Sequence, residues 1–146
     1  MEQILIRRAS IEDIHRVKAL ADSHKMELGF VLRPALEKSI LCNELLIASD
    51  GAMSEVLGFT DYHHRRDEQT TLYHIVVAPR HRNKGIGTLL LTALLNEANE
   101  QDKKRIVLKC PVDLDANMFY KKVGFRLLAR QNGTGRDLNI WRIDLE

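Results

Sequence analysis

One segment of the 146-residue chain constrains the fold more than any other, because a strand, a glycine-bearing basic turn and a long helix follow one another directly. Residues 70–78 are rich in β-branched and apolar side chains, which predicts a strand that ends at Pro79. Leucine and alanine recur at helical spacing over residues 85–101. This order of elements is typical of proteins in which helices cover a sheet.

The rest of the chain alternates in the same way. Further strands are predicted near residues 4–6, 45–48, 56–62, 106–108, 125–130 and 138–145, and further helices over residues 14–21, 34–41 and 114–123. The short apolar run 106–108 predicts a central parallel strand. We therefore expect an α/β fold in the broad sense, a mixed sheet of about seven strands with about four helices, in one domain over residues 1–146.

Composition excludes several classes of protein. The chain is 45% hydrophobic and 29% charged, as in ordinary globular domains, and its formal net charge of +2 is too small for a nucleic-acid-binding surface. Its apolar runs are far shorter than the ~18–20 residues that span a membrane. Two cysteines are too few for a disulfide scaffold, and no spacing of cysteine and histidine indicates a metal site. We expect a cytoplasmic protein without metal, nucleic-acid or membrane partners.

The turn Arg82-Asn83-Lys84-Gly85-Ile86-Gly87 has the chemistry of a phosphate site. Glycine lets a ligand approach the backbone, and the free amides at a helix N-terminus attract anions. The alternative is an ordinary basic loop. The turn differs from a Walker A loop, because Lys84 precedes the glycines, and it lacks the third glycine of the dinucleotide fingerprint.

The spacing Arg82-x-x-Gly85-x-Gly87 resembles the pyrophosphate-binding motif of the GNAT superfamily, the acetyl-CoA-dependent N-acetyltransferases. A second segment, from Tyr120 to Gly124-Phe125, resembles the family's Tyr-x-x-x-Gly-Phe segment at the expected separation. The resemblance covers roughly residues 72–130. It implies the GNAT fold, with the sheet splayed between the strands at 71–78 and 105–110, and direct transfer of an acetyl group from acetyl-CoA to a primary amine.

The resemblance also implies roles for single residues. The cofactor-binding set that it implies is Ile75, Val76, Val77, Arg82, Asn83, Lys84, Gly85, Ile86, Gly87, Thr88 and Asn117. A bulge near Ile75 would direct an amide at the thioester carbonyl, an oxyanion-hole contact. Tyr120 would protonate the departing thiolate, although it is alternatively a half-buried core aromatic. Asn117 lies on the same helix face and is either a cofactor contact or simply exposed to solvent.

The general base is the role that the sequence leaves open. Many members of the family carry a glutamate on one of the two strands beside the splay, but neither 71–75 nor 106–110 holds a carboxylate here. A lysine amine with a pKa of ~10.4 is almost entirely protonated at pH 7, so it needs a base. The candidates are His74, Tyr73, and Asp61 or His63 acting through a water; His74 is alternatively packed without a role. Strand parity separates Tyr73 from His74 unless a bulge intervenes.

The acceptor amine belongs either to a small molecule or to a peptide or protein. Basic side chains in the loop 23–33 and the hairpin 63–66 favour an acceptor that also carries a carboxylate or phosphate, although a solvated polar loop explains them equally well. Two rival functions stay open: a GNAT-fold module that senses acyl-CoA without turnover, and an unrelated phosphate-binding domain. The closing strand 138–145 is a candidate edge for a homodimer.

Overall fold

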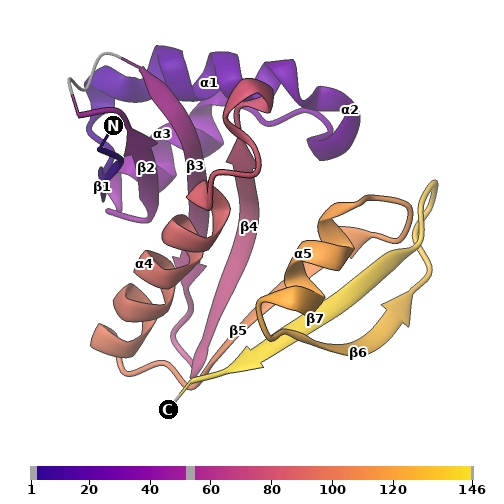
Figure 1. Ribbon diagram of the computed structural model, residues 1–146. Helices are drawn as coiled ribbons and strands as arrows, with labels where there is room; N and C mark the ends of the chain where they lie inside the picture. Colours follow the sequence, from indigo (N-terminus) through magenta and orange to yellow (C-terminus); the bar gives the residue numbers. More distant parts are fainter. Residues whose placement is uncertain (1–2, 52–54, 146) are drawn as a thin grey trace.

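The computed structural model describes residues 3–51 and 55–145, which form one mixed seven-stranded sheet in the order β1-β2-β3-β4-β5-β7-β6 (Figure 1). The strands are β1 (Leu5–Arg8), β2 (Leu45–Ser49), β3 (Val56–His64), β4 (Gln69–Val77), β5 (Arg105–Pro111), β6 (Arg126–Gln131) and β7 (Leu138–Asp144). The helices are α1 (Ile14–Ser23), α2 (Lys25–Leu28), α3 (Arg33–Leu41), α4 (Ile86–Glu100) and α5 (Ala116–Lys122), with short 3-10 turns at Ile11–Asp13 and Pro79–His81.

The predicted α/β class and the predicted strands are confirmed. The described residues contain five α-helices rather than about four, because the loop expected over 24–32 includes the single turn α2. Four residues are too few to show a helical period in the sequence. No helix in the described part of the chain is long and apolar enough to cross a membrane.

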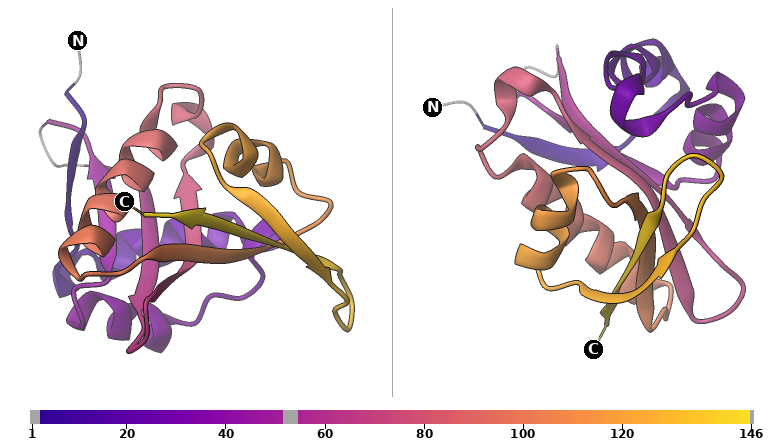
Figure 2. Two further views of the ribbon diagram at one scale, coloured as in Figure 1. Left: turned by 90° about the horizontal axis from the view of Figure 1, so that it is seen from below. Right: turned by 90° about the vertical axis from the view of Figure 1, so that its right-hand side faces the viewer.

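Helices cover both faces of the sheet, as the right-hand view of Figure 2 shows. On one face, α1 and α3 pack against a cluster that includes Leu45 and Ile47 of β2. On the other face, α4 and α5 pack against a cluster that includes Leu46 and Ala48 of the same strand. Alternate residues of a strand point to opposite faces, so an apolar run without polar interruptions is what a doubly covered strand requires.

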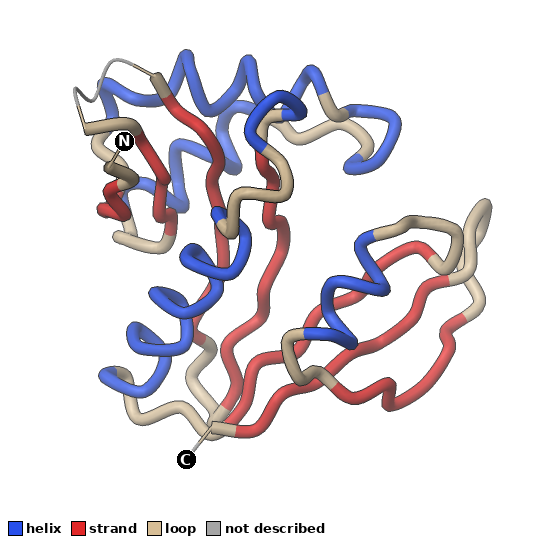
Figure 3. The backbone as a smooth tube through the Cα atoms, in the orientation of Figure 1, coloured by secondary structure: helices blue, strands red, loops and turns tan. Residues whose placement is uncertain are grey.

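The sheet opens between β4 and β5, as the family resemblance implied. These strands pair in parallel only from Gln69–Arg105 to Leu72–Leu108. Beyond Leu72 they diverge, and β5 continues as the antiparallel partner of β7 (Figure 3). The side of β4 that faces β5 therefore has no strand partner over residues 73–77 within the described structure.

The bulge in β4 lies two residues earlier than expected. Asp61 pairs with His74 and Tyr62 pairs with Leu72, so the residue between them, Tyr73, has no partner on β3. The prediction of a bulge near Ile75 is therefore wrong in its position. The extra residue shifts the alternation of side chains along β4, which cancels the separation of Tyr73 from His74 that strand parity predicted.

The expected dimer edge is also wrong. The closing strand β7 lies between β5 and β6 and pairs with both, so it has no free edge. Its register with β5 is continuous from Leu138 to Asp144. The outer strands of the described sheet are β1 and β6.

Candidate active site

A groove of about 900 Å³, called here the splay groove, lies where β4 and β5 separate. One wall is β4 at residues 75–77, and the opposite wall is formed by residues 113–116 with Phe119 and Lys122. The start of α4 and the α1–α2 corner form the ends. Nine of the residues expected to bind the cofactor line it: Ile75, Val76, Val77, Arg82, Asn83, Gly85, Ile86, Gly87 and Thr88. Lys84 and Asn117 do not.

The glycine turn places the N-terminus of the 15-residue helix α4 at the groove. Gly85 has a φ of 80°, a left-handed backbone conformation that is strained for a residue with a side chain. A Cβ on Gly87 would lie 3.3 Å from Cζ of Phe119, so the ring of α5 rests on the start of α4. The two glycines therefore serve different purposes: Gly85 permits the turn and Gly87 permits the close contact between helices.

The basic residues of the turn are partly engaged within the protein. Arg82 lies 3.6 Å from Glu27 of α2 and donates from Nε to the carbonyl of Val77. Arg80 forms an ion pair with Glu55, and Nζ of Lys84 lies 3.4 Å from Nδ1 of His81. Arg82 is therefore the one arginine of the turn that lines the splay groove in the described structure.

Asn117 connects α5 to β7 and is not among the residues that line the splay groove. Its Nδ2 donates to the carbonyls of Pro111 and Leu114, both at 2.8 Å. Its Oδ1 accepts from Nε1 of Trp141 at 2.9 Å and from Asn139 at 3.1 Å. The side chain is partly buried and its hydrogen-bonding groups are satisfied within the protein, which is a structural role that the sequence did not reveal.

Tyr120 lies in the core beneath the groove wall. Its ring packs edge-on against Phe119 and Phe125, with centroids 5.6 Å away in each case. Burial raises the pKa of the Tyr120 hydroxyl well above its ordinary value, and Cys110 raises it further. Burial also raises the pKa of the Cys110 thiol to about 11, so both groups stay protonated at neutral pH. Asp113 pairs with Arg136 at 3.0 Å, and α5 begins after Asp115.

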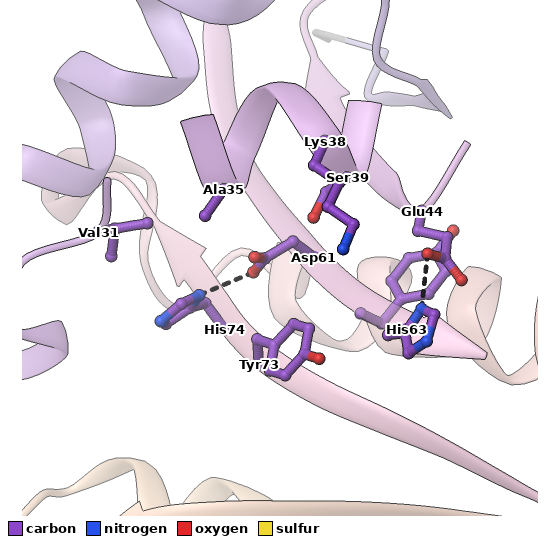
Figure 4. Close-up of a pocket in the computed structure, with 10 residues that line it drawn as sticks. Val31, Ala35, Lys38, Ser39, Glu44, Asp61, His63, Tyr73 and His74 are labelled. Atoms are coloured by element: carbon purple, nitrogen blue, oxygen red, sulfur yellow. Dashed lines mark hydrogen bonds and ion pairs between the residues drawn. The ribbon is translucent and has the colours of Figure 1, made fainter. Parts of the chain in front are cut away.

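A second cavity of about 360 Å³, called here the His74 pocket, lies between α3 and the bulged part of β4 (Figure 4). Nδ1 of His74 lies 2.9 Å from Oδ1 of Asp61, whose side chain is 5% exposed. The bulge brings Tyr73 to the same pocket. The carboxylate that the two splayed strands lack is therefore supplied by β3.

The pocket contains a second imidazole held by a carboxylate. Nδ1 of His63 lies 2.9 Å from Oε1 of Glu44, and Oε2 of Glu44 accepts from the backbone amide of His64 at 2.7 Å. Glu44 and Lys38 were missed by sequence reasoning, because Lys38 lies on α3, Glu44 lies just before β2, and neither belongs to a motif. No cluster of three or more histidine, cysteine or acidic side chains in residues 3–51 and 55–145 is arranged to hold a metal ion.

A mixed sheet that opens beside a glycine turn and a helix N-terminus defines the class of α/β proteins with an acyltransferase fold. The model of the acetyltransferase (GNAT) family matches residues 14–125. The chain belongs to this family.

Solved structures share the fold at low sequence identity. Ard1 from Thermoplasma volcanium is 21% identical, with a TM-score of 0.87 and 98% of each chain covered. N-acetylglutamate synthase from Neisseria gonorrhoeae, solved with coenzyme A and N-acetyl-glutamate, is 19% identical with a TM-score of 0.85, covering 99% of this chain and 35% of that one. YncA from Salmonella typhimurium, solved with acetyl-CoA, is 19% identical with a TM-score of 0.79, covering 98% and 94%. No curated protein sequence matches the chain.

Proposed function

We propose that the protein transfers an acetyl group from acetyl-CoA to a primary amine bound in the His74 pocket, with His74 as the general base. One observation carries the proposal. His74, which is held by Asp61, directly precedes Ile75 on β4, and Ile75 lines the splay groove. Adjacent strand residues are about 3.3 Å apart along the strand. Adjacent strand residues direct their side chains to opposite faces, so the two cavities meet at β4 itself. We propose that an amine held at His74 reaches a cofactor along residues 75–77 at the edge of β4 that has no strand partner.

Asp61 determines which nitrogen of His74 is available. A nearly buried carboxylate at Nδ1 favours the tautomer with the proton on Nδ1, because the carboxylate can only accept a hydrogen bond. The lone pair is then on Nε2, where it can accept a proton from the attacking amine. Imidazole suits this role because its ordinary pKa is near neutrality.

The residues of the splay groove fit acetyl-CoA. The amides at the start of α4 and the side chain of Arg82 suit a pyrophosphate, and the unpaired side of β4 suits the amide-bearing pantetheine arm. When bound, acetyl-CoA supplies the acyl thioester. We propose that the Tyr120 hydroxyl, which lies in the core beneath the groove wall, donates a proton to the departing thiolate.

The rival function, a sensor of acyl-CoA without turnover, rested on the missing base. The Asp61–His74 pair removes that argument, and the neighbour solved with N-acetyl-glutamate supports an acetylated amine as product. The cytoplasmic location and the single domain over residues 1–146 stay predictions.

Turnover of acetyl-CoA on a panel of primary amines tests the proposal with His74→Gln and Asp61→Asn. We expect kcat/KM to fall by about 10²–10⁴-fold in His74→Gln, the usual contribution of general base catalysis. The stabilisation of the protein by acetyl-CoA in a thermal-shift assay should be unchanged.

His15→Gln is the matched control, since His15 is exposed on α1 and lines neither cavity. Wild-type turnover and pH dependence in His74→Gln would refute the base. Binding of acetyl-CoA without turnover on any amine would support the sensor instead.

A further inference from the structure

We propose that the acceptor is a primary amine that also carries a carboxylate a few bonds away, and that Lys38 binds this carboxylate. The inference rests on the proposed function, because it takes the His74 pocket as the acceptor site. It adds the chemical class of the acceptor and a residue that selects it.

The polar part of the surface that a ligand meets in the His74 pocket includes two imidazoles and the ammonium of Lys38. The two carboxylates lie behind it, with side-chain exposures of 5% for Asp61 and 11% for Glu44. The imidazoles that cover them are more exposed, at 23% for His74 and 48% for His63. Because each carboxylate already accepts at least one hydrogen bond from its histidine, little of its surface is free to bind a ligand.

Lys38 adds a positive charge without a counter-ion to this surface. Its side chain extends from α3 toward the pocket, above Asp61 (Figure 4). Within the described part of the chain, its ammonium has neither an ion pair nor a hydrogen bond. The neighbouring cation on the same helix, Arg33, is by contrast paired with Glu37 at 3.2 Å. An exposed, unpaired ammonium at the rim of a pocket is available to an anion.

The arrangement separates the two ends of the acceptor. The amine must lie at Nε2 of His74 to lose its proton, and the rest of the molecule then extends toward Lys38 and His63. Val31 lies on the side of His74 away from Lys38 and His63, and with Ala35 it supplies apolar surface near the imidazole (Figure 4). The volume of about 360 Å³ lies within the range of small-molecule sites, which suits an amino acid or the first residue of an acidic peptide.

A diamine is the alternative acceptor, because two carboxylates line the pocket and could bind a second ammonium group. It would require a second ammonium to reach Glu44, which already accepts from His63 and from the amide of His64. It would also bring that ammonium close to Lys38. Both effects favour a carboxylate over a second amine.

The test compares matched pairs of amines with wild-type protein, Lys38→Met and Lys38→Arg. Each pair is an amino acid and its carboxamide, with increasing separation: glycine, β-alanine and γ-aminobutyrate; an acidic dipeptide and butane-1,4-diamine complete the panel. The measured quantity is the ratio of kcat/KM for acid over amide. The change of this ratio between proteins cancels the different basicity of the two amines, as in a double-mutant cycle.

We expect an acid-to-amide ratio above one at the best separation in the wild type, and a fall of about tenfold in Lys38→Met, mostly through KM. Lys38→Arg should keep most of the preference. Lys104→Met, an exposed lysine that lines neither cavity, should match the wild type. An equal ratio in Lys38→Met and wild type, or a preference for the diamine, overturns the inference. Absence of turnover on every amine would refute the proposed function itself.

Discussion

Replacing Asn117 tests whether this residue holds α5 on the sheet or contacts the cofactor. Asn117→Ala removes the hydrogen bonds to Pro111 and Leu114 and leaves Nε1 of Trp141 without its acceptor. Trp141 is only 6% exposed, so water cannot readily replace that acceptor. The carbonyls of Pro111 and Leu114 keep backbone partners and lose less.

The expected loss follows from these contacts. A buried polar group left without a partner costs about 1–3 kcal/mol, and the orphaned indole is the largest part. We expect the free energy of unfolding to fall by roughly 2–3 kcal/mol once the lost carbonyl contacts are added. With a urea m-value of about 2 kcal/mol/M, the unfolding midpoint falls by about 1–1.5 M.

Two further variants separate the halves of the contact. Asn117→Asp keeps the acceptor for Trp141 but places a carboxylate oxygen against two carbonyl oxygens, so it should also destabilise the fold. Trp141→Phe removes the indole donor and also some core volume, so the loss in Trp141→Phe/Asn117→Ala should be smaller than the sum of the two single losses. Unfolding curves near those of the wild type, together with weaker acetyl-CoA binding, would refute the structural role and restore the cofactor contact.

Two other substitutions give shorter tests. Arg7 holds the pKa of the Asp13 carboxyl below its ordinary value, so the ionised carboxyl stabilises the fold above about pH 4, and this stabilisation is lost as the pH falls through the lower folded-state pKa. Asp13→Asn should weaken the pH dependence of stability to urea in this range. An unchanged pH dependence would contradict this. Gly87→Ala places a Cβ 3.3 Å from the Phe119 ring and should weaken acetyl-CoA binding in a thermal-shift titration. Adding Phe119→Leu should restore part of the lost affinity. Full affinity in Gly87→Ala alone would show that the ring moves aside without weakening binding.

Local patterns predicted the parts of the fold that depend on local physics. The strand, glycine turn and helix from residues 70 to 101 follow from side-chain periodicity and from the conformational freedom of Gly85. The splay followed from the family resemblance, because nothing local shows where two strands stop pairing. The helix α2 was missed because one turn has no period.

The parts of the site that escaped prediction depend on register and on distant partners. The position of the bulge is decided by which residues of β3 and β4 pair, and a shift of one residue moves it without changing the composition. The two donors that hydrogen-bond to Oδ1 of Asn117 lie on β7, more than twenty residues away, so the role of its side chain is invisible in its own helix. Lys38 reaches the pocket because α3 packs on β3, and Glu44 reaches it because β2 pairs with β3, where the amide of Tyr62 donates to the carbonyl of Glu44.

The bulge at Tyr73 links the two halves of the proposed chemistry. Without the extra residue, strand parity would place Tyr73 and His74 on opposite faces of the sheet; with it, both line one pocket while the next three residues line the splay groove. The proposed base, His74, and the residues proposed to hold the cofactor, 75–77, are therefore consecutive in β4. In the proposed reaction, an amine held at His74 attacks the acyl group without a carrier, and Cys110 of β5 is a buried thiol with its pKa raised to about 11. Both features favour direct attack by the amine over relay through a thiol.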